Sequence, residues 1–148
     1  MKDAINKFFK AETYAVIGVS SNPRKFGNVV YRSLKEHGLT VYPVNPRLTE
    51  VDGDTCYPSV LELPYTVHAV VTVVPPEVTT AVVADCARTN IRAIWMQQGS
   101  ESKAAIEKAE YHGIEVIHGQ CILMFMEPVK SFHRVHRWVN KMVGAYPN

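Results

Sequence analysis

The sequence predicts an α/β fold, a doubly wound parallel sheet of five strands, on three observations. Short apolar runs alternate with amphipathic helical stretches along the chain, which is typical of a parallel sheet covered by helices on both faces. The strongest run, at 67–74, is almost continuously apolar, as expected of a strand buried on both sides. Pro75 and Pro76 end this run, and proline suits the first turn of a following helix. With right-handed crossovers, we expect a Rossmann-like sheet of strand order 3-2-1-4-5.

Apolar periodicity and turn residues place the elements in order. An apolar run that ends at Gly18 predicts the first strand, and Asn45-Pro46 ends the second. Gly38 and Gly113 follow two helical stretches, where glycine is favoured because it adopts the left-handed conformation of helix C-termini. The predicted strands lie at 14–17, 40–44, 67–74, 93–96 and 115–117, and the predicted helices at 26–38, 60–63, 77–89, 102–112 and 128–143.

Length and composition indicate one cytoplasmic domain over residues 1–148. Apolar residues make up 47% of the chain and charged residues 20%, and no apolar run is long enough to span a membrane. The first ten residues, MKDAINKFFK, lack the apolar core of a signal peptide. Cys56, Cys86 and Cys121 are odd in number and widely spaced, which favours reduced thiols and argues against a zinc site. A net charge of +2 argues against nucleic acid as the main partner.

The loop after the first strand differs from the dinucleotide-binding fingerprint. Glycines would be required at the second and fifth positions after Gly18, but Ser20 and Pro23 stand there. The loop nevertheless suits phosphate, since it combines glycines for close backbone approach, hydrogen-bonding side chains, two cations and the start of a helix. The residues that carry these properties are Gly18, Ser20, Asn22, Arg24, Lys25 and Gly27.

The end of the second strand indicates which nucleotide is bound. NAD-binding chains usually carry an acid there for the ribose hydroxyls. In the segment VYPVNPR at 41–47 there is none, and the first acid is Glu50. Asn45 and Arg47 suit a phosphorylated ribose instead, which leaves NADP or coenzyme A.

Together these segments resemble the small CoA-binding proteins related to the CoA-binding domain of the succinyl-CoA synthetase alpha subunit. The resemblance covers nearly the whole chain, and its more specific parts are VYPVNP at 41–46 and WMQQG at 95–99. The other segments that carry it are VIGVS at 16–20, GNVV at 27–30, Gly53, YPS at 57–59, LP at 63–64, VVP at 73–75 and Cys121.

The resemblance implies that different segments of the chain bind different parts of coenzyme A. The loop at 18–27 would hold the pyrophosphate, 45–47 the phosphorylated ribose, 74–75 the adenine or the pantetheine arm, and 97–99 the pantetheine amides. The residues it assigns to the ligand are Gly18, Val19, Ser20, Asn22, Arg24, Lys25, Gly27, Asn28, Asn45, Pro46, Arg47, Val74, Pro75, Gln97, Gln98, Gly99 and Cys121. The chain departs from the family where His68 replaces a frequent Asp, and at 118–120, where the family often has Asp-Arg.

Other reactive residues give weaker signals. Cys121 could meet the thiol of coenzyme A or be a small buried side chain. His133 and His136 lie three residues apart, yet no further ligand completes a metal site with them, so none is predicted. The predicted helix at 128–143 carries a basic face and an apolar face, which suit solvent, a homodimer or an unidentified protein partner.

We therefore expect a protein that binds coenzyme A or acyl-CoA without turnover, because no catalytic constellation emerges. Two alternatives remain. One is an NADP-dependent oxidoreductase. The other is a regulatory module that responds to CoA or redox state and acts through a protein partner. The basic helix and Cys121 are the features on which that alternative depends.

Overall fold

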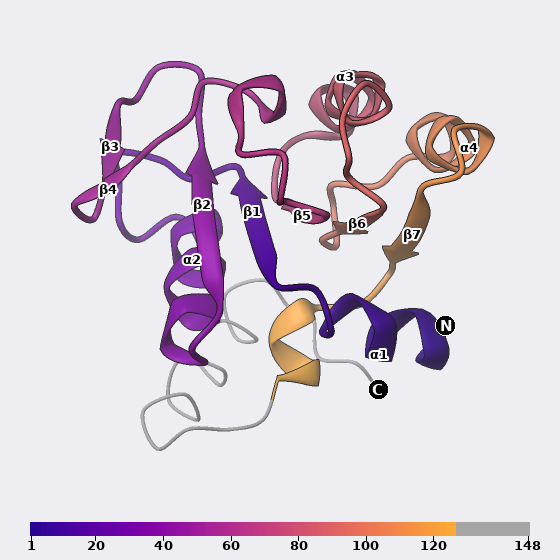
Figure 1. Ribbon diagram of the computed structural model, residues 1–148, viewed down its shortest axis with the longest axis horizontal. Coiled ribbons are helices and arrows are strands. Elements are labelled where there is room, and N and C mark those ends of the chain that lie inside the picture. Colours follow the sequence, from indigo (N-terminus) through magenta and orange to yellow (C-terminus); the bar gives the residue numbers. More distant parts are fainter. Residues whose placement is uncertain (127–148) are drawn as a thin grey trace.

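The computed structural model of the chain describes residues 1–126 and confirms the α/β class (Figure 1). Five parallel strands form the main sheet, and a two-stranded hairpin lies beside it. The strands are β1 (Thr13–Ile17), β2 (Thr40–Val44), β5 (Ala69–Thr72), β6 (Ala93–Met96) and β7 (Glu115–His118), and the hairpin is β3 (Glu50–Val51) with β4 (Asp54–Thr55). The helices are α1 (Lys2–Phe8), α2 (Phe26–Glu36), α3 (Pro76–Cys86) and α4 (Lys103–Tyr111), with 3-10 turns η1 (Val60–Glu62) and η2 (Ile122–Phe125). The helix predicted at 128–143 lies outside the described residues.

The strand order differs from the expected one. The sheet runs β2-β1-β5-β6-β7, so the third strand of the main sheet lies beside the first and not outside the second. Counted along the main sheet, the order is 2-1-3-4-5, and the predicted 3-2-1-4-5 is wrong at that strand. The doubly wound parallel architecture with five strands is confirmed.

The position of β2 at the edge of the sheet fits its sequence. Pro43 lacks an N–H group, so β2 suits a sheet edge better than a central position. Its carbonyl accepts a hydrogen bond from the Tyr57 N–H at 3.0 Å, and Tyr57 in turn bridges Val44. The segment that returns from the hairpin thus occupies the outer edge, where the predicted order requires a full strand. β5 is buried at every position, as a central strand should be.

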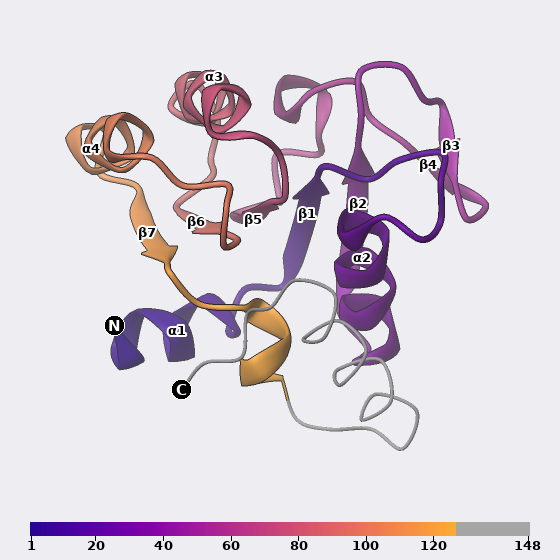
Figure 2. The ribbon, with the colours of Figure 1, turned by 180° about the vertical axis from the view of Figure 1, so that it is seen from behind.

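Two apolar layers enclose the sheet, in line with the alternation of side chains along its strands. On β1, Tyr14 and Val16 pack into the layer under α1, α2 and η2, whereas Ala15 and Ile17 pack under α3 and α4. Figure 1 shows α3 and α4 together on one face and α2 on the other, and Figure 2 shows η2 between α1 and α2. Within residues 1–126 there is no helix long and apolar enough to cross a membrane.

Neither α1 nor the hairpin was predicted from the sequence. Phe8 of α1 packs against the rings of Tyr14 and Trp95, with ring centroids 5.4 and 5.3 Å away. The hairpin is joined to α2 through Asp54, which accepts hydrogen bonds from Lys35 and from the Tyr31 hydroxyl. These two bonds hold the pKa of Asp54 below its ordinary value. The second half of α2 is therefore fixed to the hairpin.

Candidate functional site

The candidate site lies at the carboxyl edge of the sheet, where the loops after all five main strands meet. In such sheets the ligand binds where the chain turns to opposite sides, which here is between β1 and β5. The loops after these two strands approach very closely. A Cβ on Gly18, whose φ is +124°, would lie 2.2 Å from the Val73 carbonyl oxygen, so only glycine fits.

Gly27 has a similar role at the start of α2. A Cβ on Gly27 would lie 2.2 Å from the carbonyl oxygen of Gly18, so the first turn of α2 sits directly on the end of β1. The first turn of α2 contains no acid. Its unpaired N–H groups and the positive end of the helix dipole are therefore available to an anion near this loop.

Side chains within the loop hold it in shape. Asn28 is buried and forms two hydrogen bonds to the backbone of Ser20: its Oδ1 accepts from the Ser20 N–H at 2.7 Å, and its Nδ2 donates to the Ser20 carbonyl at 2.9 Å. The Ser20 hydroxyl accepts from the Asn22 N–H at 3.0 Å. Asn28 is buried and thus fixes the loop, whereas Asn22 is exposed.

The loop after β2 repeats the local structure of the first. Both contain Asn-Pro-Arg, and in both the asparagine Oδ1 accepts from the arginine N–H, at 3.0 Å for Arg24 and 2.7 Å for Arg47. The Nδ2 of Asn45 also donates to the Val19 carbonyl at 2.8 Å, which joins the two loops. Residues 18–28 and 45–47, which we call the basic loops, are therefore one connected unit on neighbouring strands.

The basic loops present three exposed cations. Arg24, Lys25 and Arg47 all lie at the surface, and none of them takes part in an ion pair within the described part of the chain. Pro46 is exposed beside them, whereas Val19 is buried under the loop and can offer only its backbone. The structure thus brings the predicted cations to one edge and leaves their charge uncompensated.

A hollow of about 320 Å³ continues the site past β5. It is lined by Val73, Val74, Pro75, Gln98, Gly99 and Ser100, which come from the loops after β5 and β6. Behind it lies a buried row of hydroxyls: Ser100 donates to Thr72 at 2.8 Å, and Thr79 and Ser100 are 2.7 Å apart. This row ties the two loops together. These hydroxyls were not predicted from the sequence, although a threonine within an otherwise apolar central strand was a usable signal.

The loops after β6 and β7, residues 97–99 and 118–121, differ in character. Gln97 is buried, and its Oε1 accepts from the Ile122 N–H at 3.1 Å. Gln98 is exposed, and its Nε2 lies 3.4 Å from the Gly119 carbonyl. Of the predicted pantetheine contacts, Gln98 and Gly99 thus face solvent, whereas the side chain of Gln97 is used to hold η2 in place.

Cys121 does not present a reactive thiol. Its side chain is 1% exposed at the start of η2, and burial raises the pKa of the thiol, although hydrogen bonding to Gln97 and nearby backbone opposes that shift. A thiol of this kind stays protonated and is a poor nucleophile at neutral pH. Within residues 1–126 no group of histidines, cysteines and carboxylates is arranged to hold a metal ion, and the predicted candidates His133 and His136 lie outside that range.

Comparison with known proteins identifies this arrangement. Residues 12–127 match the family model described as a CoA binding domain. The chain is 32% identical to the ADP-forming acetate–CoA ligase I of Archaeoglobus fulgidus over 130 residues, 81% of this chain and 19% of the ligase. It is 26% identical to the uncharacterized protein YneT of Bacillus subtilis over 76% of this chain and 84% of YneT.

Solved structures agree with the sequence matches. A conserved hypothetical protein of Pyrococcus furiosus superposes with a TM-score of 0.74 at 37% identity, over 78% of this chain and 99% of that one. The chain therefore spans about a fifth of the ligase, yet nearly the full length of small proteins of the same fold. With the family model matching most of its length, the chain belongs to the CoA binding domain family.

Proposed function

We propose that this chain binds coenzyme A or an acyl-CoA at the carboxyl edge of the sheet and releases it unchanged. One observation carries the proposal: three cations without an ion-pair partner among the described residues, Arg24, Lys25 and Arg47, stand on two loops that a shared hydrogen bond joins. Coenzyme A has a pyrophosphate and a ribose phosphate on one nucleotide. Two clusters of phosphate charge thus meet two arginine-bearing loops.

The nucleotide end of the ligand lies on the basic loops. The pyrophosphate takes the N–H groups at the start of α2 together with Arg24 and Lys25, as anions do at helix N-termini. The ribose phosphate takes Arg47, whose guanidinium can form two parallel hydrogen bonds to it. Asn28 and Asn45 act through the backbone they hold and not through contact with the ligand.

The pantetheine arm runs through the hollow beside Val74 and Pro75. This hollow is apolar on the β5 side and offers Gln98 and backbone groups on the β6 side. The two amides of pantetheine find partners there, while its methyl groups cover the apolar wall. Because Cys121 is buried, the thiol of the ligand meets no nucleophile from that side chain.

Binding without turnover fits the site as it stands. Cys121, which follows β7 at this edge, is buried, and burial raises the pKa of its thiol. The exposed charged groups of the basic loops are cations, which suit the binding of phosphate. This chain matches only 19% of the Archaeoglobus ligase and 28% of the Pyrococcus ligase subunit, so their printed activity is not carried over to it. A binding role, either as carrier or as sensor, is the simpler explanation.

Thermal shift with a panel of nucleotides tests the proposal. Coenzyme A at 100 times its dissociation constant should stabilise the chain by about 2.7 kcal/mol, and NADP and NAD at the same concentration should stabilise it much less. Stabilisation by NADP alone would replace the proposal with the oxidoreductase alternative. Prolonged incubation with acetyl-CoA, followed by thiol titration, checks turnover, and release of free thiol would show that the chain is a hydrolase.

A further inference from the structure

A second hollow lies at the opposite edge of the sheet, where β5, β6 and β7 begin. Its volume is about 220 Å³, and its lining comes from the end of α1 and from the first residues of those three strands. The lining residues are Lys7, Phe8, Lys10, Ala11, His68, Ala69, Arg92, Ala93 and Glu115. Because it opens at the amino edge, it is separate from the candidate CoA site.

Cations dominate the rim of this hollow. Lys7, Lys10 and Arg92 face a single carboxylate, Glu115, which lies 3.9 Å from Lys7. Lys10 and Arg92 form no ion pair within residues 1–126. An anion that enters the hollow therefore meets two uncompensated charges.

His68 adds to the same side of the hollow. Its Nδ1 donates to the Asn90 carbonyl at 2.9 Å, so Nε2 is the ring nitrogen left for a ligand. His68 carries no carboxylate, so it does not repel an anion at the rim as an acid at this place would.

The backbone beneath the rim is rigid and already satisfied. The Arg92 N–H donates to the His68 carbonyl at 2.7 Å, and the Glu115 N–H donates to the Arg92 carbonyl at 2.9 Å. The Phe8 carbonyl at the end of α1 accepts from both the Ala11 N–H and the Tyr14 hydroxyl. This carbonyl therefore needs no donor from a ligand, and its repulsion of an anion is reduced.

The floor of the hollow is apolar. Phe8, Ala11, Ala69 and Ala93 form it, and Phe8 and Ala69 are almost fully buried. The volume is smaller than the roughly 300–1,000 Å³ of pockets for drug-sized ligands, so only a small molecule fits. The occupant needs an anionic head for the rim and a compact apolar body for the floor.

We propose that this amino-edge hollow binds a small carboxylic acid with a short aliphatic or aromatic body. The carboxylate lies between Arg92 and Lys10, with His68 beside it, and the body covers the alanine floor. Arginine suits this task because its planar guanidinium pairs with both carboxylate oxygens. The site is independent of coenzyme A, since it uses the other edge of the same strands.

Titration with benzoate, followed through the backbone amides, tests the site. Benzoate should shift the amide signals of Ala69 and Ala93 with a dissociation constant on the order of 1 mM. Benzamide, its neutral counterpart, and inorganic phosphate, an anion without an apolar body, should bind much more weakly. Saturation with coenzyme A should leave the benzoate affinity unchanged.

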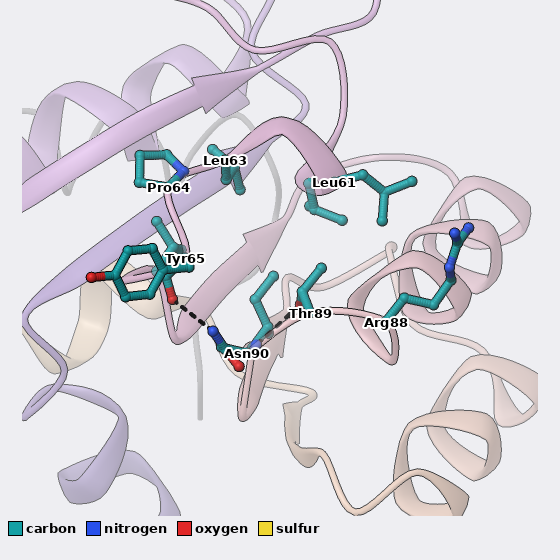
Figure 3. A pocket seen from close by; sticks show the side chains of 10 residues that line it. Leu61, Leu63, Pro64, Tyr65, Arg88, Thr89 and Asn90 are labelled. Carbon is teal, nitrogen blue, oxygen red and sulfur yellow. Dashed lines mark hydrogen bonds between the residues drawn. The ribbon is translucent and has the colours of Figure 1, made fainter.

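Variants that change the charge by the same amount distinguish binding in this hollow from a general effect of the net charge. Arg92→Gln should weaken benzoate binding roughly tenfold, as expected for the loss of a charge-assisted contact. His68→Asp should weaken it by a similar factor, because the new carboxylate repels the anion. Arg88→Gln is the matched control, because Arg88 is exposed in a different hollow of about 290 Å³, between η1 and the turn after α3, where it faces Leu61 (Figure 3). That variant should bind benzoate normally.

Four results would overturn the proposal. They are no binding of benzoate to the wild-type chain, equal binding of benzamide, displacement of benzoate by coenzyme A, and an Arg88→Gln effect as large as that of Arg92→Gln. The first three test which ligand binds and where it binds, and the last tests whether the effect is specific to Arg92. Displacement by coenzyme A would also question the proposed carboxyl-edge site, whereas the other three results leave that site untouched.

Discussion

The two halves of the carboxyl edge use the same kinds of residue to different ends. On the basic loops, asparagine side chains hold the backbone and leave three cations in solvent. On the loops after β6 and β7, the side chain of Gln97 holds the backbone in the same way. The exposed residues there, Gln98 and Gly99, are uncharged, and the thiol of Cys121 is buried.

This contrast indicates where affinity for coenzyme A arises. Charge-assisted hydrogen bonds are about twice as strong as neutral ones, so in the proposed binding mode the basic loops should dominate the affinity. The loops after β6 and β7 should then contribute only shape and neutral contacts. The affinity of the chain should therefore depend strongly on the nucleotide end of its ligand and only weakly on the thiol or acyl end.

The largest expected effect concerns the glycine that frames the basic loops. Gly18→Ala should lower the free energy of unfolding by about 3 kcal/mol, because the new Cβ meets the Val73 carbonyl and the residue keeps a positive φ. Urea denaturation measures the loss. Gly53→Ala is the control, since Gly53 has a φ of +82° but nothing within 4 Å of its Cβ. It should lose only about 1 kcal/mol, and equal losses would show that close approach is not what requires Gly18.

The next effect concerns one cation. Arg47→Gln should raise the dissociation constant for coenzyme A roughly tenfold, because it removes a charged partner of the ribose phosphate. Dephospho-CoA, which lacks that phosphate, should bind the variant and the wild type about equally. Calorimetry measures both, with Arg88→Gln as the control for loss of one exposed charge elsewhere. A variant that still prefers coenzyme A tenfold would remove Arg47 from this role.

A smaller effect concerns the buried thiol on the other half. Burial raises the pKa of Cys121, so as pH rises the unfolded chain loses its thiol proton before the folded chain does. The stabilisation is complete below the ordinary thiol pKa and declines above it. The free energy of unfolding should thus fall as pH rises above the ordinary thiol pKa of about 8.5, and less steeply in Cys121→Ala.

The other buried cysteines provide the reference for that comparison. Burial raises the pKa of Cys86 to about 12, and this thiol contributes to the alkaline decline of both proteins. The difference between the two slopes isolates Cys121. Identical slopes, or rapid labelling that is lost in Cys121→Ala at neutral pH, would show that Cys121 is accessible and would support its redox role.

The smallest effect is expected at Gln98. Gln98→Ala should weaken coenzyme A binding by roughly threefold at most, the value of one neutral hydrogen bond. Its side chain is exposed and uses its amide in a long contact to the Gly119 carbonyl. A loss as large as that of Arg47→Gln would reverse the proposed balance between the two halves of the edge.

Periodicity predicted the five strands and the helices between them, because burial on both faces leaves a strong local signal in runs such as 67–74. Strand order was not predicted, since it depends on the long-range bridge between Val44 and Tyr57. Pro43 is a local signal that favours an edge position for β2, and the prediction did not use it. α1 was missed because its support comes from Trp95, far along the chain.

The contact of the predicted site residues with a ligand stays a prediction, and the structure shows only where these residues lie. Residue types at strand ends indicated Arg24 and Arg47, which the structure leaves exposed as a ligand requires. The same reasoning could not separate residues that face a ligand from residues that hold a loop. Asn28 and Gln97, both predicted to contact the ligand, form hydrogen bonds that join segments which sequence spacing does not relate.

Calorimetric comparison of coenzyme A, acetyl-CoA and dephospho-CoA on the wild-type chain shows which end of the ligand controls binding. If the basic loops dominate, coenzyme A and acetyl-CoA should bind within about twofold of each other, and dephospho-CoA roughly tenfold more weakly. If acetyl-CoA and coenzyme A instead differ tenfold while dephospho-CoA matches coenzyme A, the thiol end controls binding and the basic loops do not.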